Sequence, residues 1–509
     1  MDIPDLKQKP EISAALAGLL GNAEKLQRDA ALAGFRRQLG RLQGHVQQCF
    51  ENDGLNGLAA ARLHAGLMDE LIGGLFSYAL SVMPIGAQDR LSVAATGGYG
   101  RATLAPFSDI DLLFLTGETP SPAVDRAVEF VLYFLWDLGL KVGHATRSIA
   151  SCLTEAKEDV TIRTSLLDAR CLAGDRALFV EFQTAFRAGC AADGPGEYIQ
   201  AKQAERAARH RRFGDTPFMV EPNVKEGRGG LRDLQTLYWL ARYVFNTFAM
   251  TELVGKDAPG GGILTETEAR ACKRAWEYLW TVRFHLHYVA GRAEERLTFD
   301  LQPVVGARMG YTRHGRQNGV ERFMRHYFLV VREVARVTGV LEPALVRAAL
   351  GPPAIAATTD AALIEAGFVL ADGQILFAPG HDPSTDPTSV FRILIEARDR
   401  GLELHPLARR MLIRSAPLGA ELRSNKQAAS LFMNLLCGPN ESGHDPECNS
   451  ASWMAILNES GILGRYMPDW RRIVGQMQFD TYHVYTVDVH TVQCIRNLNS
   501  IERGTLKEV

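Results

Sequence analysis

The sequence lacks the features that mark membrane-spanning, secreted and zinc-stabilised proteins. No uninterrupted apolar run reaches the roughly 18–20 residues of a membrane span, and the first residues carry acids without the layout of a secretion signal. The eight cysteines are scattered and include no C-x-x-C pair, which argues against zinc and disulfide frameworks. The formal net charge is only −2, so the chain has no general attraction to nucleic acid or anionic lipid. We therefore expect a cytoplasmic protein that binds no membrane and whose partners do not include nucleic acid.

What is present is a long chain with ordinary core-forming composition. Its 509 residues, of which 46% are hydrophobic, suggest about three or four domains. Short apolar strands occur around residues 91–115 and 141–146, whereas most other segments show helical spacing of apolar residues. The predicted fold class is α+β, with a small mixed sheet inside a mostly helical chain.

Two local signals predict element boundaries further along. Thr265-x-x-Glu268 has the spacing of a capping box and predicts the start of a helix. Asp372-Gly373, inside the apolar stretch 367–377, predicts a tight β-hairpin.

The stretch 91–115 carries the residues with the clearest chemistry. An apolar strand breaks at Gly97-Gly98, and Asp109 and Asp111 stand near the start of a second apolar strand. Residues two apart on a strand share a face, about 6–7 Å apart at the backbone. Two carboxylates that close favour a hard divalent cation such as magnesium, which leaves positions open for substrate phosphates. Each part alone is commonplace, as a solvated pair of acids or a simple turn, but the combination predicts metal-assisted phosphoryl or nucleotidyl transfer.

The residues around this stretch resemble a known signature. Gly97-Gly98, Arg101 and Ser108-Asp109-Ile110-Asp111 resemble the nucleotidyltransferase motif of the DNA polymerase beta superfamily. The fuller string GGYGRATLAPFSDIDLLFL is similar to the PII uridylyltransferase family, as are PNVKEGRGGLRDLQTLYWL and two helical segments, 286–302 and 320–334. Enzymes of that family uridylylate the nitrogen-signalling PII protein and also remove the group.

The resemblance implies a reaction and a set of sites. UMP would pass from UTP to a tyrosine of PII, with release of pyrophosphate. Asp109 and Asp111 would bind Mg²⁺ in a two-metal site together with UTP. Gly97 and Gly98 would cradle phosphate, and Arg101, with Ser108 beside the acids, would support the nucleotide or pair with an acid.

Asp168 is the candidate for a third carboxylate. It lies in the apolar run 166–172, which we predict to be a strand, and an unpaired charge there would be costly. It resembles the superfamily's third acidic position, which would share a metal and help to deprotonate the attacking hydroxyl. The alternative is a core ion pair with Arg170 or Arg163. Asp159, in a polar helix, is a weaker candidate for the same role.

The glycine-rich loop before the helix at Leu234 carries Lys225, Arg228 and Arg232. Chemically these cations could clamp a triphosphate. The alternative is a structural turn in which Arg232 pairs with Asp233 and caps the helix.

The carboxyl-terminal stretch is similar to the entry of the family's uridylyl-removing part, a metal-dependent phosphohydrolase of the HD type. His490 matches the first metal-ligand histidine of that fold, although Val489 stands where the family more often has an acid. The other ligands of that site do not follow before Val509. We therefore expect an incomplete hydrolase, with a second divalent metal and glutamine as an effector only in a full-length form.

These observations predict four segments. Residues 1–80 form a helical segment, 81–175 the nucleotidyltransferase core, and 176–345 a helical associated domain. Residues 346–509 form the uridylyl-removing region, with the start of an HD domain near 480–509.

Three rival functions follow from the same residues. A nucleotidyltransferase could use RNA or a small molecule as acceptor, although the near-neutral charge argues against a large RNA. A non-catalytic module could bind PII or nucleotide, although the paired carboxylates argue against a decayed site. A metal phosphohydrolase would need ligands that the sequence does not supply after His490.

Overall fold

The computed structural model describes residues 28–214, 216–255, 257–258, 262–315, 317–355, 360–437, 450–477, 479 and 485–502. Most of them are helical and two small sheets accompany the helices, which confirms the α+β prediction. The chain forms two compact units, one of Met1–Ala204 with Trp276–Glu295 and one of Glu205–Ala275 with Arg296–Val509. The finer division at residues 81, 176 and 346 remains a prediction, and its HD segment is described only over 485–502.

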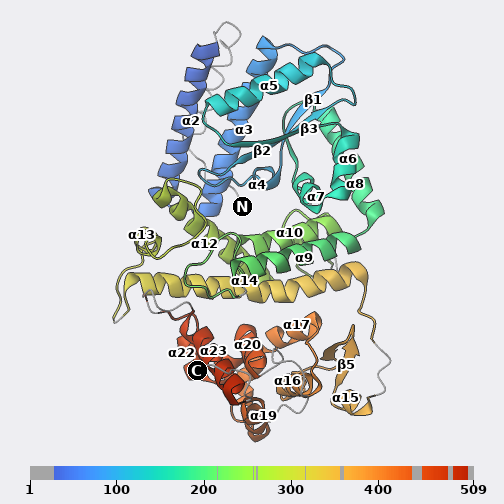
Figure 1. Ribbon diagram of the computed structural model, residues 1–509, viewed down its shortest axis with the longest axis vertical. Coiled ribbons are helices and arrows are strands. Elements are labelled where there is room, and N and C mark those ends of the chain that lie inside the picture. The colour runs from blue at the N-terminus through green and yellow to red at the C-terminus, as the bar shows by residue number, and fades with distance from the viewer. Residues whose placement is uncertain are drawn as a thin grey trace. The chain divides into compact units, whose positions relative to one another are not determined.

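A four-stranded sheet organises the first unit (Figure 1). Its strand order is β3-β2-β1-β4. β2 pairs in parallel with β3 and antiparallel with β1, and β1 pairs antiparallel with β4. The strands are β1 Leu91–Ala95, β2 Ile110–Thr116, β3 Val142–Arg147 and β4 Arg170–Gly174. The two central strands are the apolar runs of the sequence, because a strand covered on both faces is buried along its whole length.

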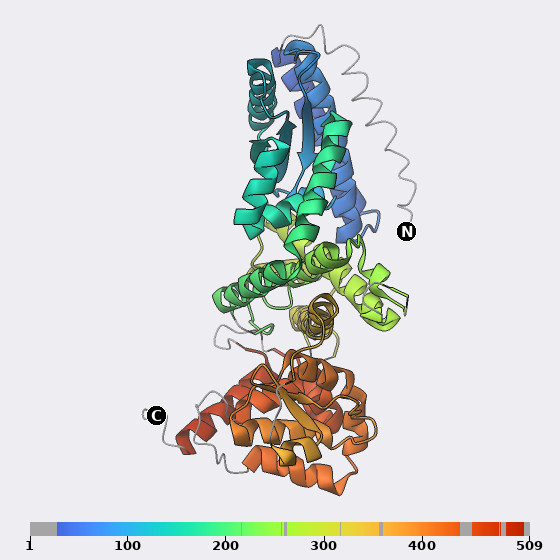
Figure 2. The same ribbon diagram turned by 90° about the vertical axis from the view of Figure 1, so that its right-hand side faces the viewer.

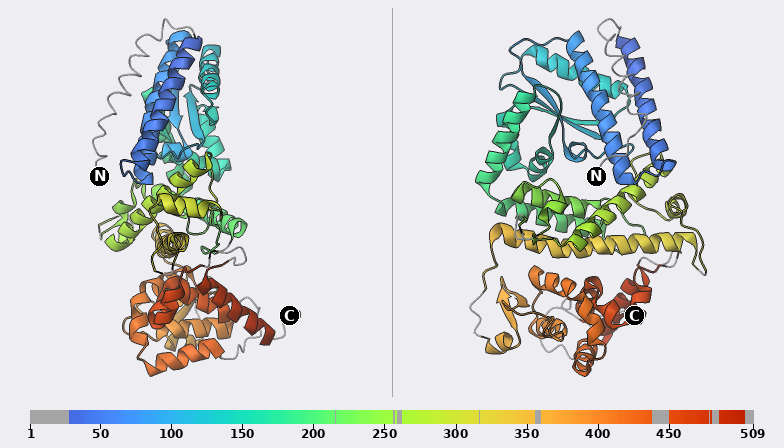
Figure 3. Two further views of the ribbon diagram at one scale, coloured as in Figure 1. Left: turned by 90° about the vertical axis from the view of Figure 1, so that its left-hand side faces the viewer. Right: turned by 180° about the vertical axis from the view of Figure 1, so that it is seen from behind.

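Helices cover both faces of this sheet. Leu113 and Leu115 of β2 pack with residues of α6, α7 and α8, whereas His144 of β3, whose side chain points to the other face, contacts Trp136 of α5. The strands run between these helices in Figure 2, and α2 runs alongside α3 in Figure 3. The helices are α2 Arg28–Glu51, α3 Gly57–Val82, α4 Gly97–Gly100, α5 Pro122–Asp137, α6 Ile149–Glu158, α7 Val160–Leu167 and α8 Arg176–Asp193.

Two helices contribute residues to both units. They are α9, Gly196–Phe213, and α12, Glu266–Ala290. The capping box at the start of α12 is confirmed: the Thr265 amide donates to Glu268 Oε2 at 2.9 Å, and the Glu268 amide donates to Thr265 Oγ1 at 3.2 Å.

Among the described residues of the second unit, helices predominate and one hairpin forms the only sheet. Its longest helix, α14, contacts α10, α13 and α17. The predicted hairpin is confirmed, with Asp372 and Gly373 both in the left-handed region that a two-residue hairpin turn requires. The elements are α10 Leu231–Phe245, η2 Met250–Leu253, α13 Leu301–Arg308, α14 Gly319–Leu350, α15 Ala361–Glu365, β5 Phe368–Ala371, β6 Gln374–Phe377, α16 Ser389–Arg400, α17 Pro406–Arg414, η3 Ala416–Leu418, α18 Gly419–Leu422, α19 Lys426–Cys437, α20 Ser450–Ser460, α21 Ile462–Tyr466, α22 Pro468–Ile473 and α23 Val487–Glu502.

No helix in the described part of the chain combines the length and the apolar character that crossing a bilayer requires.

Candidate functional site

The strand break predicted at Gly97-Gly98 is confirmed: β1 ends at Ala95, and the diglycine begins a single helical turn, α4. Gly97 has a φ of +56°, a backbone conformation that side chains with a Cβ rarely adopt. A Cβ at this position would also lie 2.9 Å from Asp111 Oδ2. Two constraints therefore favour glycine at position 97: the positive φ of its backbone and the Asp111 carboxylate beside it.

Asp111 is the second residue of β2 and is half-buried. Its partner in the strand register is Gly143 of β3. A Cβ on Gly143 would lie 2.6 Å from Asp111 Oδ1, closer than any real contact of a Cβ. The Asp111 carboxylate thus occupies a cradle between Gly97 and Gly143, one glycine on each side.

Asp109 precedes β2 by one residue and is exposed. Within the described part of the chain, neither a hydrogen bond nor an ion pair of its side chain is found. The pair therefore offers one carboxylate that the backbone holds in place and one that faces solvent. These are hard oxygen donors of the kind that Mg²⁺ prefers, with room for substrate phosphates.

Asp168 lies in the turn between α7 and β4, so the prediction that it stands inside a strand was wrong. Its side chain is fully buried and pairs with Arg101, whose Nη1 lies 2.5 Å from Asp168 Oδ2. The ion-pair alternative named Arg170 or Arg163, and the observed partner is Arg101. A Cβ on Gly100 would lie 2.4 Å from the Asp168 carbonyl oxygen, so the two turns touch through their backbones as well.

Arg170, the first residue of β4, also contacts the α4 turn. Its guanidinium donates to both carboxylate oxygens of Asp69, at 2.6 and 3.0 Å. It also donates to the carbonyl of Tyr99 at 3.2 Å. Asp69 comes from α3, and sequence reasoning missed it because nothing local links it to the diglycine. Together Arg101–Asp168 and Arg170–Asp69 fix the segment that leads from β1 toward β2.

The loop before Asp109 is held by α12. Arg283 donates to Ser108 Oγ at 3.4 Å, and His287 Nδ1 contacts the Pro106 carbonyl. Both side chains also meet Glu295: Arg283 Nη2 lies 2.5 Å from Oε1, and His287 Nε2 lies 3.5 Å from it. Ser108 therefore belongs to a buried polar network that positions the loop.

Burial alone would raise the pKa of the Glu295 carboxyl, but Arg283 and His287 together lower it to about 2. Phe107, between the two anchored residues, has a φ of +60°. A left-handed φ at a bulky residue is uncommon and costs energy, so this network holds the loop in a strained form next to the two carboxylates.

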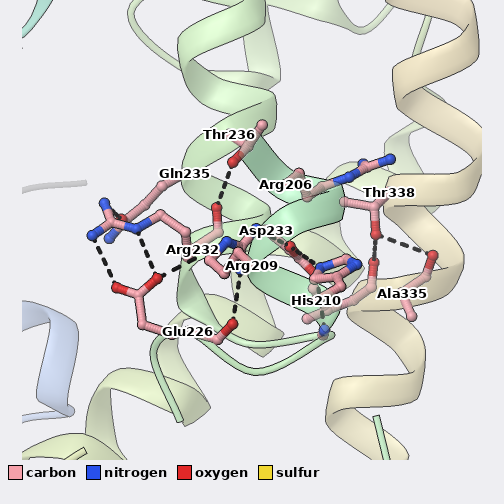
Figure 4. A network of polar contacts seen from close by, with 12 residues as sticks. Arg206, Arg209, His210, Glu226, Arg232, Asp233, Gln235, Thr236, Ala335 and Thr338 are labelled. Atoms are coloured by element: carbon pink, nitrogen blue, oxygen red, sulfur yellow. Dashed lines mark hydrogen bonds and ion pairs between the residues drawn. The ribbon is translucent and has the colours of Figure 1, made fainter. Parts of the chain in front are cut away.

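The basic loop of the second unit is paired with acids. Arg232 donates to Glu226 at 3.0 and 3.3 Å and to Gln235 at 2.9 Å (Figure 4). Arg228 lies 3.1 Å from Glu459, and Lys225 Nζ lies 3.9 Å from Glu226 Oε1. The structure brings these three cations together with glutamates, in a different unit from Asp109 and Asp111.

Asp233 does not pair with Arg232, so that part of the structural alternative was wrong. It is buried and accepts from Arg209 Nη2 at 2.6 Å and from the Gly229 amide at 2.8 Å, and His210 Nε2 lies 2.8 Å from its Oδ1 (Figure 4). Burial acts to raise the pKa of Asp233, but His210 and Arg209 outweigh it and lower the pKa to about 2. Asp233 thus ties the glycine-rich loop to α9.

His490 lies in the first turn of α23, as predicted, and is exposed. Its Nε2 lies 3.7 Å from Cys494 Sγ, one turn further along. Among the described residues, no three His, Cys, Asp or Glu side chains gather into a group that could hold a metal ion. Within the described ranges, Asp109, Asp111 and His490 therefore belong to no such group, and the metal-binding roles predicted for them and for Asp168 remain predictions.

Comparisons with known proteins agree with the resemblance of the motifs. A family described as GlnD PII-uridylyltransferase matches residues 197–341. A bifunctional uridylyltransferase/uridylyl-removing enzyme of Gluconobacter oxydans is 46% identical over 495 residues, which is 94% of this chain and 51% of that protein. Enzymes of the same name from Azospirillum brasilense and Rhodospirillum rubrum are each 41% identical, over 96% and 94% of this chain and 52% and 50% of theirs. The chain spans about half the length of these curated relatives.

Proposed function

This chain is a homologue of the bifunctional uridylyltransferase/uridylyl-removing enzymes along nearly its whole length, and we propose that it transfers UMP from UTP to a tyrosine of the PII protein. The observation that carries the proposal is the Asp111 carboxylate held between Gly97 and Gly143, with Asp109 exposed beside it. Two oxygen donors on one short segment, one held in place and one exposed, are the kind of ligands that Mg²⁺ prefers.

In the proposed reaction the tyrosine oxygen bonds to the α-phosphorus of UTP. The bond from that phosphorus to the oxygen bridging to the β-phosphate breaks, and pyrophosphate leaves with that electron pair. Asp109 and Asp111 would hold Mg²⁺, which when bound neutralises the triphosphate and stabilises the attacking and leaving oxygens. The protein contributes orientation and fixed charge.

Asp168 has a positioning role in this proposal. Activation of the tyrosine hydroxyl by Asp168 would require its ion pair with Arg101 to open. As the structure stands, Asp168 fixes Arg101 and the α4 turn, and through them the Gly97 side of the cradle. The phenol has an ordinary pKa of about 10, and its proton can pass to solvent.

Two further sites belong to the proposal with weaker support. A triphosphate clamp of Lys225, Arg228 and Arg232 would require these side chains to exchange glutamate for phosphate oxygens. His490 would be one ligand of a second metal, used in uridylyl removal, whose other ligands are not among the described residues.

The decisive experiment incubates the protein with labelled UTP, Mg²⁺ and purified PII. We expect label on PII, and loss of transfer in the Asp109→Asn/Asp111→Asn variant and after chelation of divalent metal. Glu129→Gln, on the exposed side of α5, is the matched control for removal of an acid from the same unit.

The outcomes separate the rival functions. UTP binding without transfer to PII would favour a regulatory module, and transfer to RNA or to a small molecule in place of PII would change the acceptor. Transfer that survives in the double variant would overturn the assignment of the two carboxylates.

A further inference from the structure

Within the described part of the chain, β3 is an edge strand of the sheet, because β2 is its one neighbour in the strand order. The Lys141 carbonyl accepts from the Ile110 amide of β2 at 2.9 Å. Backbone groups of successive strand residues point to opposite edges, so those of Gly143 and Ala145 also face β2. The amides and carbonyls of Val142, His144 and Thr146 therefore face outward, and no backbone hydrogen bond outside the sheet is found for them in the described part of the chain.

Within β3 there is no proline, lysine or bulge to oppose strand addition, and Lys141 lies just before the strand. Proteins block such edges with proline, lysine or a bulge, and β3 reads VGHATR, pairing with β2 in continuous register. Its one charged residue, Arg147, stands at the end and pairs with Glu155. An edge left open beside a candidate active site is a place for β-augmentation by a partner segment.

Because Gly143 has no side chain, a residue of a strand added at this edge could reach Asp111. On the face of the sheet that carries Asp111, the residue of β3 between Asp111 and the open edge is Gly143, which has no side chain. A strand added beyond β3 would lie two strand spacings, about 10 Å, from β2. A serine or threonine hydroxyl, one bond beyond Cβ, falls short of that span. A tyrosine can lay its ring across Gly143 and bring its hydroxyl to the carboxylates.

The opposite face of β3 offers an apolar border. Tyr133 and Trp136 of α5 are 59% and 43% exposed, and their rings lie 5.5 Å apart in an edge-to-face arrangement. Trp136 also contacts His144 at 5.9 Å between ring centroids. Side chains that flank a tyrosine in an added strand point to this face, because alternate residues do so.

We propose that an extended segment of the acceptor protein pairs with β3 as a fifth strand and presents its tyrosine across Gly143 to Asp111. The inference rests on the proposed function, and it adds the docking surface and a structural reason for tyrosine as the acceptor. In this proposal the outward amides of β3 bind the acceptor segment. The space above Gly143 selects an acceptor residue whose side chain is long and ends in a hydroxyl.

The test compares His144→Pro with His144→Ala in the full chain. Both variants lose the imidazole, but only proline removes the outward amide and blocks pairing, and proline is tolerated on an edge. We expect His144→Pro to raise the KM for PII at least tenfold over His144→Ala, with the KM for UTP within twofold. Equal KM values for PII in the two variants would overturn the docking mode while leaving the transferase assignment intact.

A second measurement applies to the unmodified protein and does not depend on the folding of a variant. Hydrogen exchange is followed with PII added and UTP omitted, and we expect protection of the amides of Val142, His144 and Thr146. Absence of protection while PII is bound would refute the proposal. Protection that rises with the protein's own concentration, without PII, would show that a second copy occupies the edge, and would refute it too. Failure of the proposed function is recognised separately, as no transfer and no PII binding by the unmodified protein.

Discussion

The Asp111 carboxylate fills the space that a side chain on Gly143 would need: a Cβ there would lie 2.6 Å from Asp111 Oδ1. On the other side, a Cβ on Gly97 would lie 2.9 Å from Oδ2. The carboxylate can therefore occupy this position only because neither Gly97 nor Gly143 has a side chain. Even an alanine at either glycine would displace it.

Gly143→Ala should lower the rate of transfer at least tenfold while the protein stays folded. The added methyl must displace the carboxylate, and a misplacement of about 1 Å can cost about a hundredfold in rate. Steady-state kinetics with PII and UTP, together with a thermal melt, test this. Gly117→Ala is the control, because a Cβ at Gly117 meets nothing within 4 Å. An equal loss of transfer rate in Gly143→Ala and Gly117→Ala would contradict the prediction that contact with the Asp111 carboxylate causes the loss.

Asp168→Asn should destabilise the first unit by about 3–5 kcal/mol, because it removes the buried carboxylate that pairs with the largely buried Arg101 guanidinium. An Arg101→Met/Asp168→Leu variant should cost less than the sum of its single changes. Urea denaturation measures both. If Asp168 instead acts directly on the tyrosine hydroxyl, Asp168→Asn would abolish transfer with little change in stability and Arg101→Met would retain it.

Glu295 should make stability depend on pH in the acid range. Its folded pKa of about 2 lies below the ordinary value of 4.5, so its contribution is fully present above pH 4.5 and is lost as the pH falls toward 2. The shift corresponds to about 3 kcal/mol. Glu295→Gln should therefore lower the melting temperature at pH 7 and flatten its decline between pH 4.5 and 2. Glu129→Gln, which makes none of these contacts, should leave the profile unchanged.

Adjacent residues of the basic loop should respond differently to neutralisation. Asp233→Asn should cost about 3–5 kcal/mol, because the buried Arg209 would lose its closest carboxylate and keep only Glu226, whose Oε2 lies 3.9 Å away. Arg232→Gln should cost about 1 kcal/mol or less, because its pair with Glu226 is partly exposed to solvent. Denaturation curves of the two variants measure both changes in the free energy of unfolding. A rise in the KM for UTP in Arg232→Gln, without loss of stability, would instead support the triphosphate clamp.

Periodicity and turn chemistry predicted most of the elements near the site. Continuous apolar runs identified β1 and β2, and the strand at 141–146 was found as β3. The strand predicted at 166–172 was right only from Arg170, where β4 begins; residues 166 and 167 end α7, because a short apolar run fits a helix end as well as a strand. Asp159 was placed inside a helix. It is the cap where α7 begins, and its carboxylate accepts from the Thr161 and Ile162 amides.

The partners of the site residues could not be read from the sequence. Arg101 meets Asp168 across 67 residues, and Arg283 meets Ser108 across 175. Periodicity fixes which face a side chain occupies, but it carries no information about which distant element that face meets. Gly143 did carry a usable signal, since a glycine inside a strand often marks a close approach of another group.

The first compact unit is assembled from two stretches that the gene keeps apart, Met1–Ala204 and Trp276–Glu295. The second stretch is closely fitted to the first: Thr281 accepts from the Gly57 amide at 2.9 Å, and a Cβ on Gly57 would lie 2.3 Å from the Trp280 carbonyl carbon. The unit therefore cannot be exchanged between genes as one continuous cassette. A recombination breakpoint anywhere between codons 205 and 275 would join halves with separate histories, so inheritance must keep both stretches linked.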